Sequence, residues 1–202
     1  MRQPRFSLCL LCLVLWLAGC TWPFGRKVPQ PEAPSDAREQ LLMGVGCDRR
    51  GDHAGAARWY RLAARQGLAE AQNNLGVMLK DGQGVARDER EAAEWFLKAA
   101  RQGYALAQSN LGWMYQAGLG VEQDYRQARH WYLEAARQGH AAAQNNLGRL
   151  YRDGLGGPAD TDSALYWFGE ADRQGLPQAK RNLEKMDSSA ARNSQEWSRN
   201  ED

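Results

Sequence analysis

Apolar residues recur along most of the chain with the period of an α-helix. In one such stretch, Ala71 and Leu75 fall on one face of a helix over about residues 70–80. Glycines follow at Gly82 and Gly84, and glycine readily adopts the left-handed backbone that ends a helix. The pattern therefore predicts a first helix that is closed by a glycine turn.

A second amphipathic stretch follows directly. Asp88 stands where an N-cap residue is needed, and Glu91, three positions later, completes the pattern of a capping box. Ala92, Trp95 and Phe96 then lie on one helical face, which we expect to be buried. Small residues on both helices allow a close approach, and Trp95 is expected to fill the gap between neighbouring hairpins. The two stretches together predict a helical hairpin.

The hairpin pattern recurs with a fixed step of 36 residues. The tripeptide Asn-Leu-Gly begins at Asn74 and again at Asn110 and Asn146. A tryptophan followed by Tyr or Phe keeps the same step, at Trp59, Trp95, Trp131 and Trp167. Such a period is typical of solenoids, in which each hairpin buries its apolar face against its neighbours. The predicted fold is therefore all-α, an α-solenoid of stacked helix-turn-helix units.

These motifs resemble the Sel-1-like repeat, a relative of the tetratricopeptide repeat. The residues that carry the resemblance are Ala71-Gln72-x-Asn74-Leu75-Gly76-x-Met78, then Gly82-x-Gly84-Val85, then Ala92-x-x-Trp95. The third complete repeat, at about residues 140–175, departs from the motif at Gly157-Pro158, where a valine is expected. The resemblance implies stacked hairpins whose first helices line a concave groove, and a role in binding other proteins.

The repeats cover about residues 38–186. We expect four units, at about 38–67, 68–103, 104–139 and 140–175. A lone capping helix is predicted over 176–186, because Asn182-Leu183 keeps the register while Glu184 replaces the glycine. The remaining residues, 187–202, are polar and are expected to be a disordered tail.

The first nineteen residues have the pattern of an export signal. Arg2 and Arg5 precede eleven mostly apolar residues, Leu8–Ala18, too few for a membrane-spanning helix of about twenty. Leu17-Ala18-Gly19-Cys20 follows and resembles the lipobox of bacterial lipoproteins. The resemblance implies that Cys20 is lipidated, with a diacylglycerol and an N-acyl chain such as palmitate. The alternative is an ordinary secretory signal with an incidental cysteine.

The residues after Cys20 bear on location. Four prolines in residues 20–37 predict an extended linker of roughly 50 Å, at about 3.1 Å per residue. Thr21 stands where an aspartate favours retention in the inner membrane of enteric bacteria, so we expect the outer membrane, facing the periplasm. The inner membrane is the alternative. Cys47 is the one cysteine left unassigned, either a buried apolar residue or an intermolecular thiol.

The first helix of each unit is expected to present polar residues to the groove. At 100° per residue, the positions opposite the buried face are Asn73, Val77, Lys80, Ser109, Trp113, Gln116, Asn145, Arg149 and Arg152. Trp113 lies outside the periodic tryptophan series, so it is either an anchor for a partner or a packing residue. Lys80, Arg149 and Arg152 would make the groove basic, which suits an acidic peptide or an anionic polysaccharide.

Charge and motifs argue against other classes of protein. Without its first nineteen residues the chain carries 24 basic and 24 acidic residues, and this balance argues against nucleic-acid binding. His53, His130 and His140 form no metal-binding pair, so neither a metal nor another cofactor is expected. The sequence therefore predicts a non-enzymatic scaffold that binds another protein within an envelope assembly or secretion complex. The alternative, a cell-wall or β-lactam hydrolase, lacks the paired cysteines of the related repeat proteins proposed for that role.

Replacement of the lipobox cysteine tests the predicted anchor. Because two or three acyl chains hold a protein on a bilayer almost permanently, Cys20→Ser should release the chain from membranes or leave an uncleaved precursor. Membrane fractionation and the mobility of the processed chain measure both effects. Unchanged fractionation together with unchanged processing would contradict the prediction.

Overall fold

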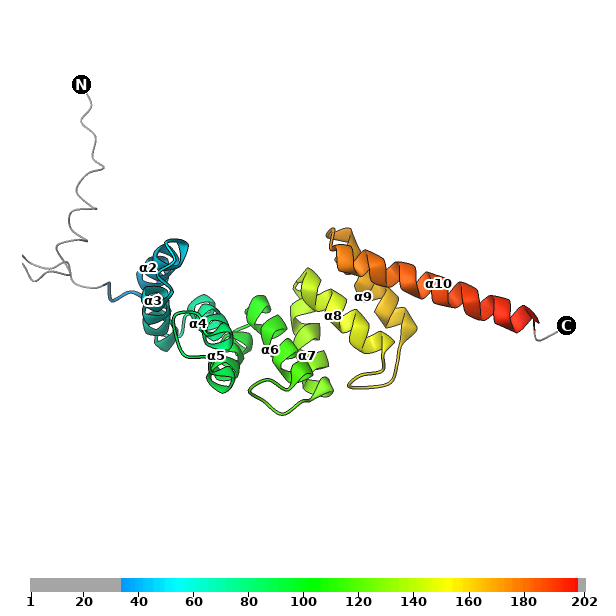
Figure 1. The fold of residues 1–202 in the computed structure, drawn as a ribbon, viewed down its shortest axis with the longest axis horizontal. Coiled ribbons are helices and arrows are strands. Elements are labelled where there is room, and N and C mark those ends of the chain that lie inside the picture. Colours follow the sequence, from blue (N-terminus) through cyan, green and yellow to red (C-terminus); the bar gives the residue numbers. More distant parts are fainter. Residues whose placement is uncertain (1–33, 200–202) are drawn as a thin grey trace, which may run out of the picture. The chain divides into compact units, whose positions relative to one another are not determined.

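The computed structural model describes residues 34–199 and, within them, the side chains up to residue 188. This part of the chain contains nine α-helices and no strand, so the predicted all-α class is confirmed (Figure 1). The helices are α2 (Ala37–Arg49), α3 (His53–Arg65), α4 (Ala69–Asp81), α5 (Glu89–Arg101), α6 (Ala105–Ala117), α7 (Tyr125–Arg137), α8 (Ala141–Arg152), α9 (Thr161–Arg173) and α10 (Pro177–Arg199). The predicted signal sequence, Cys20 and most of the linker lie outside the described residues.

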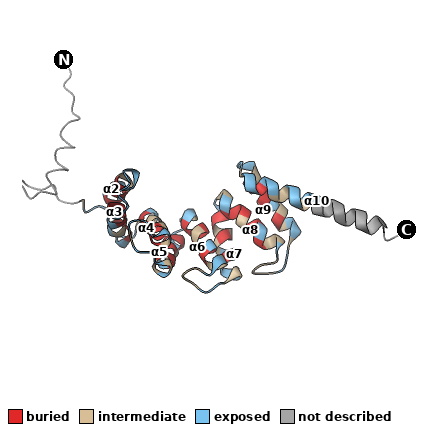
Figure 2. Ribbon diagram, viewed as in Figure 1, coloured by how far each residue is buried: buried red, intermediate tan, exposed pale blue. Residues whose placement is uncertain are grey.

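Residues from Asp36 onward form one compact unit built from consecutive hairpins. The pairs α2–α3, α4–α5, α6–α7 and α8–α9 pack internally, and the second helix of each pair packs on the helix that follows it. Buried residues lie along the helices of every hairpin (Figure 2). The described residues thus form the predicted stack of helix-turn-helix units.

Each hairpin is closed by a glycine that faces an aromatic ring. A Cβ atom placed on Gly76 would lie 2.7 Å from Phe96, and one on Gly112 would lie 2.9 Å from Tyr132. Both rings are fully buried, as is Phe168, which faces Gly148 in the same way. The glycine of the Asn-Leu-Gly tripeptide therefore makes room for the ring that fills the hairpin.

The tryptophans lie less deeply than predicted. Trp95 and Trp131 are half-buried at the edge of the core, because a helix turns about 100° per residue and the following aromatic faces the glycine instead. The indole Nε1 of Trp95 donates to the Glu91 carboxylate at 3.1 Å, and Lys98 Nζ lies 3.9 Å from the ring centroid. The tryptophans thus pack against the core, as predicted, but from its edge rather than from a fully buried face.

The N-caps of the second helices are also simpler than predicted. Asp88 Oδ1 accepts from the backbone N–H of Glu91 at 2.9 Å, as a capping box requires. The reciprocal bond is absent from this site, because the Asp88 N–H donates to the carbonyl of Leu79 at 2.9 Å. The Glu91 side chain is therefore free to accept from Trp95 and from Arg61 of the preceding hairpin.

The glycine turns hold neighbouring hairpins together. Gly120 has a φ of 68°, and a Cβ there would lie 2.1 Å from the carbonyl oxygen of Glu89 on the preceding hairpin. In the unit at 140–175, Gly157 stands where valine is expected, and a Cβ there would meet the end of the flexible Arg129 side chain. That guanidinium stacks on Tyr151, with Cζ 3.7 Å from the ring centroid. The departure from the motif thus leaves room for the arginine in this position.

A buried glutamine links each hairpin to the one before it. The Gln72 side chain accepts from Gln102 of its own hairpin at 2.8 Å and donates to the carbonyl of Ala64 on α3 at 3.1 Å. Gln108 and Gln144 repeat both bonds one and two units later. Because these buried amides are hydrogen-bonded on both sides, they fix the spacing of the units without an unsatisfied polar group.

The C-terminal helix is longer than predicted. We expected a capping helix that ends at residue 186, followed by a disordered tail, but α10 continues to Arg199. No proline or glycine occurs between residues 178 and 199 to end the helix, and polar composition alone does not do so. The first turns of α10 cover α9 and bury Ala179.

Two glycine-to-alanine variants separate packing from helix propensity. Gly112→Ala places a methyl group against Tyr132 and should destabilise the protein by about 1–3 kcal/mol. Gly46→Ala, on α2, meets an arginine side chain at 3.5 Å, so the gain in helix propensity should stabilise the protein by about 0.5–1 kcal/mol. Urea denaturation midpoints measure both. Shifts of the same sign would show that the Gly112–Tyr132 contact does not limit packing.

Candidate functional site

Only a narrow stripe of each first helix reaches solvent. The other sides of α4, α6 and α8 pack against the partner helix of the same hairpin and against the preceding hairpin. We call the solvent-facing stripe of α2, α4, α6, α8 and α10 the helix-A face. In the three central units its members are Glu70, Asn74, Val77, Asp81, Leu106, Asn110, Trp113, Ala117, Ala142, Asn146, Arg149 and Asp153.

Six of the nine predicted groove residues do not belong to this face. Lys80, Gln116 and Arg152 are half-buried, and the other three are buried. Asn73, Ser109 and Asn145 are only 5%, 8% and 7% exposed, so they are not available to a partner. Asn73 Oδ1 accepts from Asn110 Nδ2 at 2.9 Å, and Asn145 makes the same bond with Asn182 at 2.8 Å. These asparagines therefore hold adjacent first helices together, and their assignment to the groove is corrected.

The predicted groove residues one helical turn further along reach solvent to different extents. Val77 is half-buried, whereas Trp113 is 40% exposed and Arg149 is exposed. Lys80 of the preceding unit approaches the Trp113 ring, with its Nζ 5.3 Å from the ring centroid. Trp113 is thus a large aromatic side chain that stays open to solvent.

The face is less basic than the sequence implies. Arg152 donates twice to the adjacent carboxylate of Asp153, at 2.7 and 3.0 Å, and this bond holds the pKa of Asp153 below its usual range. Lys80 forms an ion pair with Asp81 in the same manner. Among the described residues Arg149 has no salt-bridge partner, so it carries most of the uncompensated positive charge predicted for this groove.

Gln116 has a structural role that the sequence does not reveal. Its Oε1 accepts from the hydroxyl of Tyr132 at 3.0 Å, and the Asn146 side chain lies near the same hydroxyl. Burial raises the pKa of Tyr132 well above its ordinary value, so the hydroxyl remains a proton donor. The sequence offers one hint of this role, because Tyr132 has a hydroxyl where two other units have phenylalanine.

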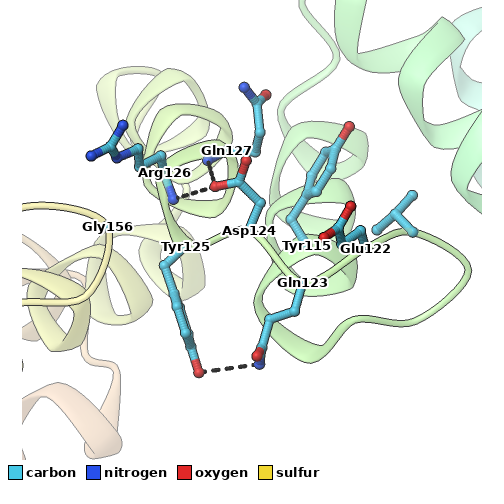
Figure 3. Close-up of a pocket in the computed structure, with 9 residues that line it drawn as sticks. Tyr115, Glu122, Gln123, Asp124, Tyr125, Arg126, Gln127 and Gly156 are labelled. Carbon is cyan, nitrogen blue, oxygen red and sulfur yellow. Dashed lines mark hydrogen bonds between the residues drawn. The ribbon is translucent and has the colours of Figure 1, made fainter.

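The described residues also contain a hollow of about 900 Å³ beside the loop between α6 and α7. Tyr115, Tyr125 and Gly156 help to line it (Figure 3). The Asp124 carboxylate in it already accepts from two backbone N–H groups as the N-cap of α7. None of the residues that line the hollow belongs to the helix-A face, and its carboxylate is engaged in capping.

The chemically reactive side chains have structural surroundings. Cys47 is buried and burial is the main cause that raises its pKa, so it lacks the features of an activated thiolate. His140 Nδ1 accepts from the N–H of Ala143 at 3.2 Å and caps α8. No cluster of three His, Cys, Asp or Glu residues that could bind a metal occurs within the described part, nor does any helix there have the length and apolarity to cross a membrane.

The exposure of Trp113 predicts that the fold does not depend on it. Because Trp113 is 40% exposed, Trp113→Ala removes fewer packing contacts than the loss of a core ring, and the free energy of unfolding should fall by about 1 kcal/mol. Tyr132→Ala, the matched control, removes a fully buried ring and should cost about 3–5 kcal/mol. Urea denaturation measures both changes. A loss of equal size in the two variants would make Trp113 a core residue.

Comparison with known proteins identifies the repeat. A family model described as the Sel1 repeat matches residues 41–68, 69–104, 105–140 and 141–176, which confirms the resemblance seen in the sequence. The chain is similar to the crystal structure of a protective antigen, displaying an SLR fold, that is present in uropathogenic Escherichia coli strains. The two are 34% identical, with a TM-score of 0.70, over 74% of this chain and 33% of that one.

A Sel1 repeat protein from Oxalobacter formigenes is similar as well, with 31% identity and a TM-score of 0.68 over 74% of this chain and 61% of that one. The chain thus spans between one third and three fifths of the length of these two relatives. A search of curated protein sequences gives no significant match. The four matched repeats cover most of the chain, and the protein belongs to the Sel1 repeat family.

Proposed function

We propose that this protein is a lipid-anchored scaffold that holds another protein at the periplasmic side of the bacterial outer membrane. Sel1 repeats generally mediate protein–protein interaction, and proteins of this family are typically non-catalytic scaffolds. The proposal adds two points for this chain: the surface through which it binds and the location where it acts.

The exposure of Trp113 carries the proposal. The glycine of each unit keeps the same contact with an aromatic ring, but Val77, Trp113 and Arg149 differ at one equivalent solvent-facing position. Residues that differ between units are not required to close the hairpin, so they are free to specialise. An exposed tryptophan on a rigid helix is also the type of residue that dominates binding energy at protein interfaces.

The N-terminal sequence supports the proposed location. Leu17-Ala18-Gly19-Cys20 has the pattern of a lipidation site, and Thr21 is not the aspartate that favours the inner membrane. A proline-rich linker of roughly 50 Å would let the repeats reach a partner that stands away from the bilayer, as in an envelope assembly or secretion complex. The anchor and the repeats then have separate tasks, attachment and recruitment.

Photocrosslinking tests the surface and the role together. Photoreactive benzoylphenylalanine replaces Trp113 in the full chain, and cells of the native host are irradiated. Because the helix-A face is the proposed binding surface, a discrete crosslinked protein should appear in the envelope fraction. Benzoylphenylalanine at Arg137, an exposed position of α7 on a second helix, is the matched control and should give no such product.

The outcomes separate the parts of the proposal. The same product from both positions, or none from position 113, would overturn the helix-A face as the binding surface. A product that survives release of the chain by Cys20→Ser would retain the scaffold but remove the need for an anchor.

A further inference from the structure

One row of the helix-A face changes character along the stack. Equivalent positions of α4, α6, α8 and α10 hold Val77, Trp113, Arg149 and Lys185, so two apolar residues are followed by two cations. We call these four residues the binding row. Three of them are exposed and Val77 is half-buried.

Contacts between the first helices make the row continuous. Lys80 reaches from α4 to the Trp113 ring on α6, and Asn182 of α10 donates to Asn145 of α8 at 2.8 Å. Between α6 and α8, the Tyr132 hydroxyl donates to Gln116 at 3.0 Å, and the Asn146 side chain lies near the same hydroxyl. Side chains rather than direct helix packing thus bridge successive first helices, so neighbouring side chains of the row are spaced by at least the roughly 8–10 Å of directly packed helices.

The charged residues around the binding row add to the difference between its apolar half and its cationic half. On α4 the exposed carboxylate of Glu70 lies on the same face, and Lys80 is neutralised by Asp81. On α8, Asp153 is occupied by Arg152, which leaves the Arg149 charge without a salt-bridge partner among the described residues. Negative charge on a ligand is therefore favoured at the α8–α10 end and disfavoured beside α4.

We propose that the binding row holds an extended segment of the partner protein, with apolar side chains over Val77 and Trp113 and acidic side chains at Arg149 and Lys185. This inference rests on the proposed function and specifies the partner. An extended chain advances about 3.3 Å per residue, so each step along the row corresponds to at least about three residues of ligand. The expected ligand thus has two apolar residues separated by at least about three positions, continued at the same spacing by two acidic residues.

A uniform polyanion fits this surface less well. Only half of the binding row is cationic, and a polysaccharide with regular negative charge would meet Glu70 and an uncharged tryptophan at the other half. The apolar half supplies a surface on which aliphatic and aromatic side chains bury area. A polypeptide with apolar residues at one end and acidic residues at the other therefore complements both halves of the binding row.

Peptide display on the full chain in detergent micelles tests the inference. A library of random twelve-residue peptides is selected against the wild-type protein and against the double variant Arg149→Glu, Lys185→Glu. The wild type should enrich peptides with the apolar pair on one side and the acidic pair on the other. The double variant should enrich basic residues instead, and should bind the wild-type-selected peptides on the order of tenfold more weakly, with the largest difference at low salt.

A matched charge reversal controls for net charge. Arg137→Glu with Arg173→Glu reverses two exposed arginines on the second helices and should leave the enriched sequences unchanged. Trp113→Ala should remove the apolar preference and keep the acidic one. Circular dichroism verifies that each variant is folded.

Several results would overturn the inference. These are a selection that enriches no peptide, an acidic preference that survives the Arg149 and Lys185 reversal, and equal losses in the control. Binding of polygalacturonate, a linear polyanion, that is unaffected by Trp113→Ala and blocks peptide binding would assign the row to a polysaccharide. Peptides that depend on Trp113 but show no charge order would leave the proposed function standing and refute the divided ligand.

Discussion

Every complete hairpin depends on the contact between a glycine of its first helix and an aromatic ring of its second. At Gly112 there is no room for a Cβ, since Tyr132 would lie 2.9 Å from it, and the same holds at Gly76 and Gly148. The two helices therefore approach at a distance that only glycine permits, and the ring is fully buried between them. Because the contact recurs with the repeat, it fixes the geometry of each unit in turn.

This close approach determines where binding can occur. A first helix that is covered by its partner and by the preceding hairpin has one free stripe, and the buried glutamines that link units keep those stripes in register. The equivalent positions of successive helices thus form continuous rows across the stack. Variation within a row changes the surface without changing the contacts that close the fold, as Val77, Trp113 and Arg149 illustrate.

The hairpins and their glycine turns could be predicted because they follow from periodicity and from backbone conformations that are local in sequence. The relative depth of Trp131 and Tyr132 could not, because it depends on which of two adjacent residues faces Gly112 on another helix. For the same reason, a helical wheel at 100° per residue placed Asn73 in the groove, although the residue is buried. The wheel treats a helix as buried on one side, whereas α4 is covered by its partner helix and by the preceding hairpin, and Asn73 also bonds to the first helix of the next hairpin.

The charge of the helix-A face could not be predicted from the sequence either, because it depends on which side chains form ion pairs. Counting cations along the first helices gives a uniformly basic groove, but the count omits Asp81 and Asp153, which directly follow Lys80 and Arg152 and neutralise them. What remains is a gradient, with an exposed acid and apolar residues at one end and Arg149 and Lys185 at the other. A gradient gives a ligand an orientation, whereas a uniform charge gives only attraction. A scaffold that must hold its partner in one arrangement needs the former, and the repeat supplies it by changing one residue per unit.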